Sequence, residues 1–340
     1  MKSSWWKTGL MYGIGLALLA YVVWSNWTGK DDQPGLKDAL NRPIRALPFA
    51  IAAVLCATNT FLTFVRWFLL VRAQNLPFTL KAAVRLGLVG NFFNTFLPGA
   101  VGGDLLKAAF IAREQQRRTV AVATVMIDRA IGLWALFVLV ALTGSTFWLI
   151  GDSAVRDQPN LRLIIRIALV VVGASLVLWA VLGLLPDRRA RVFNWRLRHI
   201  PKVGHSAAEF WTALWLYRTK GRVILTALLM SLVGHTCSVL MFICVVTAFQ
   251  PASMPTISQH FLLVPIGMAA QAIPITPGGL GVGEAVFKKL YTMVGQQGAD
   301  AIWGSLGQRM LAWSFGLIGY IVYLFMKKDL PGTVRQAATA

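Results

Sequence analysis

Two proline- and glycine-rich stretches decide the fold of this chain: Pro98-Gly-Ala-Val-Gly-Gly-Asp104 and Pro277-Gly-Gly-Leu-Gly-Val-Gly-Glu284. Each ends an apolar segment, and proline with clustered glycine interrupts a helix near its middle. The arm before the first break, residues 86–97, would be roughly 18 Å long as a helix, about half the thickness of the hydrocarbon core. We therefore predict two re-entrant helical hairpins, over residues 78–118 and 258–297, in place of two membrane-crossing helices.

The composition indicates a membrane protein. Of 340 residues, 56% are apolar and only 14% are charged, and the mean hydropathy is +0.62. Soluble domains have about 25% charged residues, so a soluble globular protein is excluded, and a disordered chain requires the opposite balance. A spanning helix needs roughly 20 apolar residues. Six runs of suitable character occur, at residues 9–24, 46–65, 119–151, 167–186, 223–249 and 298–326.

These segments predict an all-α integral membrane protein with six spanning helices, two opposed re-entrant helical hairpins and inverted-topology repeats. Aromatic residues recur at helical spacing within residues 152–222. They predict a helix that either lies on anionic lipid or packs on the bundle of spanning helices. The predicted parts are an N-terminal transmembrane helix and external loop (1–45), a first repeat with the cytoplasmic hairpin (46–151), a connecting span and basic cytoplasmic loop with the interfacial helix (152–222), a second repeat with the external hairpin (223–326) and a cytoplasmic tail (327–340).

The excess of positive charge orients the chain. Lys and Arg total 33 while Asp and Glu total 13, which gives a net charge of +20. With the N-terminus in the cytoplasm and each hairpin returning to its own side, 22 basic residues lie in cytoplasmic segments and 9 in outer segments. This bias agrees with the positive-inside rule and places both termini in the cytoplasm. The charge therefore requires no nucleic-acid partner to explain it.

The two breaks belong to an internal repeat. In the predicted topology, the first hairpin enters from the cytoplasm and the second enters from outside. An inverted repeat with one interrupted segment in each half is the plan of many transporters, and the interrupted segments point to the binding site. Four pairs of positions correspond in the two halves once Val282 is taken as a one-residue insertion: Asp104 with Glu284, Lys107 with Lys288, Asp128 with Gln308, and Arg129 with Arg309. The lysines follow their acids by three and four residues.

The polar residues near the breaks form the candidate site. A charge near the bilayer centre costs at least about 2.5–3.5 kcal/mol, so each one needs a partner or water. Arg129 and Arg309 are expected to contact an anionic head group, because a guanidinium suits phosphate. Asp104 and Glu284 either contact substrate or only cap their helices. For Arg129, the alternative is a structural ion pair with Asp128 or Asp104.

Glycine-rich helix starts add backbone N–H groups that attract anions, and neutral or basic side chains complete the predicted cavity. The further predicted substrate-binding residues are Asn91, Asn94, Lys107, Asp128 and Lys288. The residues expected to shape the hairpin tips are Pro98, Gly99, Gly102, Gly103, Pro277, Gly278, Gly279, Gly281 and Gly283.

The motifs around both breaks resemble a known family. Asn91-Phe-Phe-Asn94-Thr-Phe-Leu, the two quoted stretches and Ile127-Asp128-Arg129 are similar to the lysylphosphatidylglycerol synthase transmembrane region, or flippase-like domain family, over about residues 10–326. The resemblance implies a multi-pass protein of the bacterial cytoplasmic (inner) membrane that moves lipids between leaflets. It also implies functional roles for Asp104, Arg129 and Glu284. Only 14 residues follow Met326, so the aminoacyl-transfer domain and activity of full-length synthases are not expected here.

The sequence favours translocation of an anionic phospholipid or a polyprenyl-phosphate-linked lipid between leaflets. Two alternatives stay open: a transporter of a small soluble anion, and a non-catalytic membrane scaffold for lipid or cell-envelope biosynthesis. We expect no enzyme activity, cofactor or metal site, because the sequence has no phosphate-binding loop and no Cys or His cluster. The expected partners are membrane lipids, with a second copy of the chain or lipid-biosynthesis enzymes also open.

Overall fold

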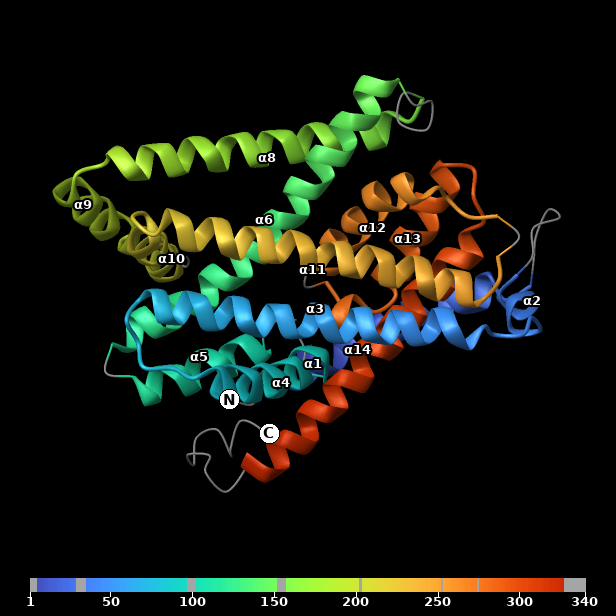
Figure 1. Cartoon of the computed structure of the whole chain (residues 1–340), viewed down its shortest axis with the longest axis horizontal. Helices are drawn as coiled ribbons and strands as arrows, with labels where there is room; N and C mark the ends of the chain where they lie inside the picture. Colours follow the sequence, from blue (N-terminus) through green and yellow to red (C-terminus); the bar gives the residue numbers. More distant parts are fainter. Residues whose placement is uncertain are drawn as a thin grey trace.

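The computed structural model describes residues 5–28, 35–96, 102–115, 117–151, 157–201, 204–251, 253–273 and 275–326 (Figure 1). In these ranges all regular elements are helices, which confirms the prediction of an all-α membrane protein. Five of the helices are long and apolar enough to cross a membrane, and they coincide with five of the predicted spans. These five are α3 (Ala46–Ala73), α6 (Arg118–Ile150), α8 (Pro159–Leu184), α11 (Gly221–Ala248) and α14 (Gly298–Met326).

The remaining predicted span falls on α1 (Trp5–Ser25), whose apolar part, Gly9–Ser25, is shorter. Between the long helices lie shorter elements that hold the two breaks and the basic loop. They are α2 (Leu36–Leu40), α4 (Leu80–Phe96), α5 (Gly102–Glu114), α9 (Asp187–Arg198), α10 (Gly204–Tyr217), α12 (Ile257–Gln271), the 3₁₀ turn η1 (Pro277–Gly279) and α13 (Val282–Met293).

Helices α3 and α11 pack side by side and run in opposite directions (Figure 1). Polar contacts join them along their length. Asn59 Nδ2 donates to Ser238 Oγ at 3.0 Å, and Arg66 Nη1 donates to Ser231 Oγ at 2.7 Å. The two helices approach closely at Gly234, where a Cβ atom would lie 2.5 Å from the Asn59 side-chain oxygen. These helices are the first elements of the two predicted repeats.

Two helix pairs, α4 with α5 and α12 with α13, lie toward opposite ends of α3 and α11 (Figure 1). Each pair is antiparallel. A Cβ on Gly103 would lie only 1.8 Å from the carbonyl oxygen of Gly90, so α5 touches the backbone of α4 there. The chain reverses direction between α4 and α5 and again between α12 and α13, as the predicted helix breaks require. Pro98 and Gly99 lie outside the described residues.

Each pair also packs on a long helix from the other half of the chain. Helix α4 packs on α14, where the rings of Phe92 and Tyr320 are 4.9 Å apart between centroids. Helix α12 packs on α6, where Thr143 Oγ1 donates to the carbonyl oxygen of Phe261 at 3.3 Å. The end of α4 also contacts η1. The two breaks therefore meet inside the bundle.

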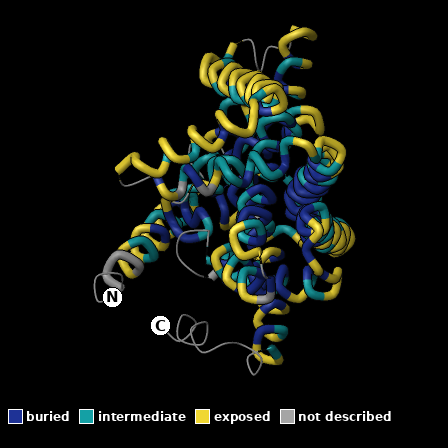
Figure 2. Tube along the Cα trace, turned by 90° about the vertical axis from the view of Figure 1, so that its left-hand side faces the viewer, coloured by how far each residue is buried: buried dark blue, intermediate teal, exposed yellow. Residues whose placement is uncertain are grey.

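Buried residues concentrate in the middle of the bundle, and exposed residues follow its outer helices (Figure 2). Many of the exposed side chains are large and apolar, including Leu149, Leu184 and Phe325. A soluble monomer rarely exposes so much contiguous apolar surface. The outer face suits contact with lipid, as expected for a multi-pass membrane protein.

Helix α10 covers part of the bundle. Tyr217 is fully buried, and its hydroxyl donates to the carbonyl oxygen of Leu70 at 2.7 Å. Burial raises the pKa of Tyr217, so the hydroxyl keeps its proton and this hydrogen bond. The sequence left two possibilities for this helix, contact with anionic lipid or packing on the bundle. The structure contains the packing on the bundle.

Candidate functional site

The second break is organised around Glu284, whose side chain is completely buried. Its Oε2 accepts a hydrogen bond from the backbone N–H of Gly281 at 2.8 Å, and this contact caps the start of α13. Its Oε1 accepts from Ser305 Oγ at 3.2 Å and from Arg309 Nε at 3.0 Å, both on α14. Glu284 thus caps its helix, as the sequence allowed, and also joins α13 to α14.

Arg309 holds the backbone of this break as well as the carboxylate of Glu284. Its Nη1 donates to the carbonyl oxygen of Gly278 at 2.7 Å, and its Nη2 donates to that of Gly279 at 3.2 Å. Both glycines have positive φ angles, +57° and +68°, which residues other than glycine rarely adopt. The guanidinium therefore satisfies carbonyl groups that a buried break would otherwise leave without donors.

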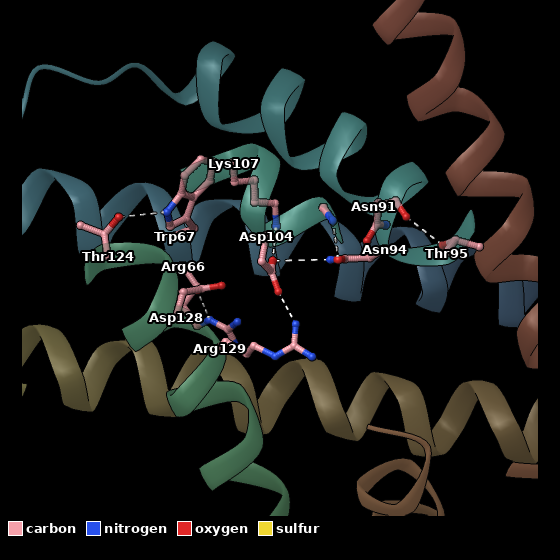
Figure 3. A network of polar contacts seen from close by, with 11 residues as sticks. Arg66, Trp67, Asn91, Asn94, Thr95, Asp104, Lys107, Thr124, Asp128 and Arg129 are labelled. Carbon is pink, nitrogen blue, oxygen red and sulfur yellow. Dashed lines mark hydrogen bonds and ion pairs between the residues drawn. The ribbon is translucent and has the colours of Figure 1, made fainter. Parts of the chain in front are cut away.

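The first break carries a corresponding arrangement around Asp104 (Figure 3). Arg129 Nη1 donates to Asp104 Oδ2, and Lys107 Nζ lies 3.6 Å from Asp104 Oδ1. Asn94 accepts the backbone N–H of Gly103 at 2.9 Å and thereby caps the start of α5. The sequence left two acidic partners open for Arg129, and the structure selects Asp104.

Asp128 points away from Arg129, its neighbour on α6, and binds Arg66 instead (Figure 3). Arg66 Nε donates to Asp128 Oδ1 at 2.7 Å, and both residues are buried. Sequence reasoning missed Arg66, because it placed the end of the second span at residue 65 and this arginine in a cytoplasmic segment. Helix α3 instead continues to Ala73. The one sequence signal for such a buried base was Asp128, an acid inside another predicted span that requires a partner.

The two predicted lysines lie in different surroundings. Lys107 is buried, and its ammonium lies 5.6 Å from the centre of the Trp67 ring, a cation–π distance. Lys288 is half-buried, and its side chain packs on Gly298 at the start of α14. Lys107 therefore belongs to the Asp104 network, whereas no contact joins Lys288 to Glu284 among the described residues.

A cavity of about 180 Å³ lies where the two breaks meet. It has room for several water molecules or a small head group. Two of the predicted binding residues, Asn94 and Arg309, line it together with Gly278. Sequence reasoning did not select the others, which are Thr95, Gln271, Ser305, Gln308, Ala312 and Trp313.

The cavity has unused hydrogen-bonding capacity and reaches the protein surface. Gln308 Oε1 is buried and has no hydrogen-bond partner among the described residues. Ala312 and Trp313 line the cavity and are both exposed. A ligand with a donor group and an apolar tail would therefore match both ends of this cavity.

A comparison with protein families identifies the family of the chain. The profile described as the lysylphosphatidylglycerol synthase TM region matches residues 11–319. The chain belongs to this family. A UPF0104 membrane protein of Methanothermobacter thermautotrophicus is 23% identical over 335 residues, which cover 92% of this chain and 94% of that protein. No solved structure matches the chain.

In this member of the lysylphosphatidylglycerol synthase TM region family, five of the predicted charged residues gather at two sites rather than one. Asp104, Lys107 and Arg129 form the first cluster, and Glu284 and Arg309 form the second. Only the second cluster borders the cavity. Within the described residues, no three His, Cys, Asp or Glu side chains lie close enough together to hold a metal ion.

Asn91 belongs to neither cluster through its side chain. Its carbonyl oxygen accepts the Thr95 hydroxyl at 2.8 Å, one turn before the end of α4. At the second break, Gln271 and Ser305 connect α12 to α14 and to Glu284. Sequence reasoning did not select these two residues. Gln271 Nε2 donates to Ser305 Oγ at 3.3 Å, and Ser305 donates in turn to Glu284. Gln271 is the last residue of α12, as Asn94 is near the end of α4.

Proposed function

We propose that this chain moves an anionic lipid, either a phospholipid or a polyprenyl-phosphate-linked lipid, between the two leaflets of its membrane. It does so without changing the lipid covalently. The observation that carries this proposal is the cavity between the breaks. It has polar groups from both halves inside, and the exposed residues Ala312 and Trp313 of α14 form part of its wall. A head group can occupy the polar part while its acyl chains stay in the bilayer.

The arrangement of the helices supports alternating access around this cavity. Helices α3 and α11 are antiparallel, and the helix pairs α4–α5 and α12–α13 lie toward opposite ends of them (Figure 1). We interpret the pairs as two re-entrant hairpins that enter from opposite leaflets, in an inverted-topology repeat. Rocking of one repeat against the other would then expose the cavity to each leaflet in turn.

The difference between the two ion pairs suggests how the head group is guided. Arg309 is committed to Glu284 and to the carbonyl oxygens of the break. Arg129 is bound to Asp104, but a third of its side chain is exposed. Arg309 lines the cavity, whereas Arg129 lies outside its lining, and so Arg129 would attract the phosphate toward the cavity from its partly exposed position.

The family assignment is compatible with this function, since it describes the membrane region of a lipid-modifying synthase. A transporter of a small soluble anion would need a cavity closed to lipid, whereas the exposed positions Ala312 and Trp313 lie on the cavity wall. A scaffold for biosynthetic enzymes would need no polar cavity at all.

Reconstitution in liposomes tests the proposal. Fluorescent phosphatidylglycerol in the inner leaflet is protected from a membrane-impermeant quencher, so loss of protection measures leaflet exchange. We expect wild-type protein to accelerate exchange over protein-free vesicles. A hydrogen bond to a charged group contributes about 1.5–3 kcal/mol, so Arg129→Gln should slow exchange by about tenfold or more. The control Arg222→Gln removes an exposed arginine at the start of α11 and should leave the rate unchanged.

Three outcomes separate the hypotheses. Equal exchange in protein-free, wild-type and Arg129→Gln vesicles would refute lipid translocation. Uptake of inorganic phosphate without lipid exchange would indicate a soluble-anion transporter. Exchange by wild type that Arg129→Gln and Arg222→Gln lower to the same extent would remove the assigned role of Arg129.

A further inference from the structure

A second and larger cavity lies away from the breaks, at the junction of α8, α9 and α10. Its volume is about 740 Å³. One wall is apolar and comes from the last turns of α8 and the loop after it, and the other comes from α9 with one indole of α10. The lining residues are Leu178, Val181, Leu182, Leu185, Arg188, Arg189, Val192, Phe193, Arg196 and Trp211.

The cavity lies where a spanning helix ends. Helix α8 is apolar up to Leu184, and α9 starts at Asp187, directly after Pro186. Arg188 and Arg189 are therefore within five residues of the end of the span. Basic side chains at this position lie at the depth of lipid head groups, where an anionic leaflet attracts them.

The charge on α9 is strongly positive and largely uncompensated. Its 12 residues include five arginines and one acid, Asp187. Asp187 accepts a hydrogen bond of 2.7 Å from Arg218, which lies just after α10. Among the described residues, no carboxylate pairs with the three arginines that line the cavity. The guanidinium groups are thus available for an anion.

The rest of α9 is fixed in place, so the arginines are held on a defined surface. Asn194 Nδ2 donates to Thr212 Oγ1 at 2.8 Å, and Trp211 Nε1 donates to the carbonyl oxygen of Ala190 at 3.1 Å. These contacts dock one face of α9 on α10. The face with Arg188, Val192 and Arg196 is then turned toward the apolar end of α8.

We propose that this cavity binds one anionic phospholipid of the surrounding membrane. The phosphate lies among Arg188, Arg189 and Arg196, and one acyl chain lies along Leu178, Val181 and Leu182 of α8. Positive charge beside an apolar wall at the end of a span complements the two parts of such a lipid. The cavity shares no residue with the cavity between the breaks, so this site does not depend on the proposed transport.

Lipid binding to the purified full-length chain tests the site. Native mass spectrometry counts the lipids retained from mixtures of phosphatidylglycerol and phosphatidylethanolamine with identical acyl chains. Wild-type protein should retain phosphatidylglycerol preferentially. The double variant Arg189→Gln/Arg196→Gln should lower its apparent affinity by about tenfold or more. The control Arg191→Gln/Arg198→Gln removes the same charge from the same helix, but neither residue lines this cavity, so its affinity should match wild type.

A charge-neutral variant keeps the test independent of net charge and of folding of α9. Val181→Trp fills the apolar wall and should also displace the lipid, while glycerol 3-phosphate, which has no acyl chain, should not compete. The proposal is overturned if wild type shows no preference for phosphatidylglycerol. It is equally overturned if the two double variants behave alike, or if glycerol 3-phosphate competes as well as the lipid. Lipid bound in the cavity between the breaks contributes equally to all these proteins and cancels in the comparison.

Discussion

Arg309 donates its Nε–H to Oε1 of Glu284 at 3.0 Å, and the two residues are 25 positions apart. Arg129 and Asp104 have the same separation in the chain and the same contact between guanidinium and carboxylate. The two pairs differ in burial. The side chains of Arg309 and Glu284 are 9% and 0% exposed, against 33% and 16% for Arg129 and Asp104. The same kind of ion pair thus occurs at both breaks, and it is buried at the second break and partly exposed at the first.

This difference in burial predicts losses of stability of different size for the same substitution. Arg309→Gln leaves the buried carboxylate of Glu284 without its base, which should cost about 3–5 kcal/mol of stability. Arg129→Gln removes a less deeply buried pair and leaves Asp104 with Lys107, so it should cost less than Arg309→Gln. Thermal unfolding of both purified variants in one detergent measures the difference. Equal losses would show that the pair at the second break is no more structural than the pair at the first.

The buried pair of Arg66 and Asp128 predicts a second stability effect. Asp128→Asn leaves the Arg66 guanidinium buried without a carboxylate and should destabilise the protein by about 3–5 kcal/mol. The matched control is Asp187→Asn, because Asp187 also binds an arginine but is mostly exposed. That control should change stability by about 1 kcal/mol or less. The double variant Arg66→Gln/Asp128→Asn leaves neither charge unpaired, and it should be more stable than Asp128→Asn alone.

The helix breaks could be predicted from the sequence because proline and clustered glycine act locally. The partner of Arg129 could not be predicted, because Asp104 and Asp128 are both near it in sequence and only the packing of α5 on α6 selects one. Arg66 was misplaced for a related reason. A charge usually ends an apolar run, but Asp128, 62 residues later, allows this arginine to stay inside the bundle.

Gln271 and Ser305 were missed because neutral polar residues carry no charge signal in an apolar segment. They enter the site through a chain of hydrogen bonds that ends at Glu284. Such a chain depends on how α12, α13 and α14 face one another, which hydropathy and spacing do not determine. The matched acids and arginines, in contrast, were found because they recur at fixed distances from the two breaks.

Close packing at the first break predicts that Gly103 tolerates no side chain. A Cβ there would lie 1.8 Å from the carbonyl oxygen of Gly90, and backbone atoms cannot move aside as a flexible side chain can. Gly103→Ala should therefore separate α5 from α4 and lower both thermal stability and leaflet exchange. Gly173→Ala on α8 is the matched control, because no atom lies within 4 Å of its added Cβ. It should be neutral or slightly stabilising, since alanine favours a helix over glycine by about 1 kcal/mol. An unaffected Gly103→Ala variant would contradict the close approach of the two helices.

The cavity between the breaks predicts a water-accessible position on α14. In a protein whose three native cysteines are replaced by alanine, Ala312→Cys places a thiol on the cavity wall. Ala301→Cys, on the same helix, places one at a fully buried position. A thiol reacts as the thiolate, which forms in water and not in an apolar interior. A negatively charged, membrane-impermeant methanethiosulfonate should therefore modify position 312 and spare position 301. Vesicles that contain phosphatidylglycerol should protect position 312 relative to vesicles of phosphatidylcholine alone, because an anionic head group would occupy the same space. Equal protection from modification at both positions would mean that water does not enter the cavity, and a head group could then not pass through it.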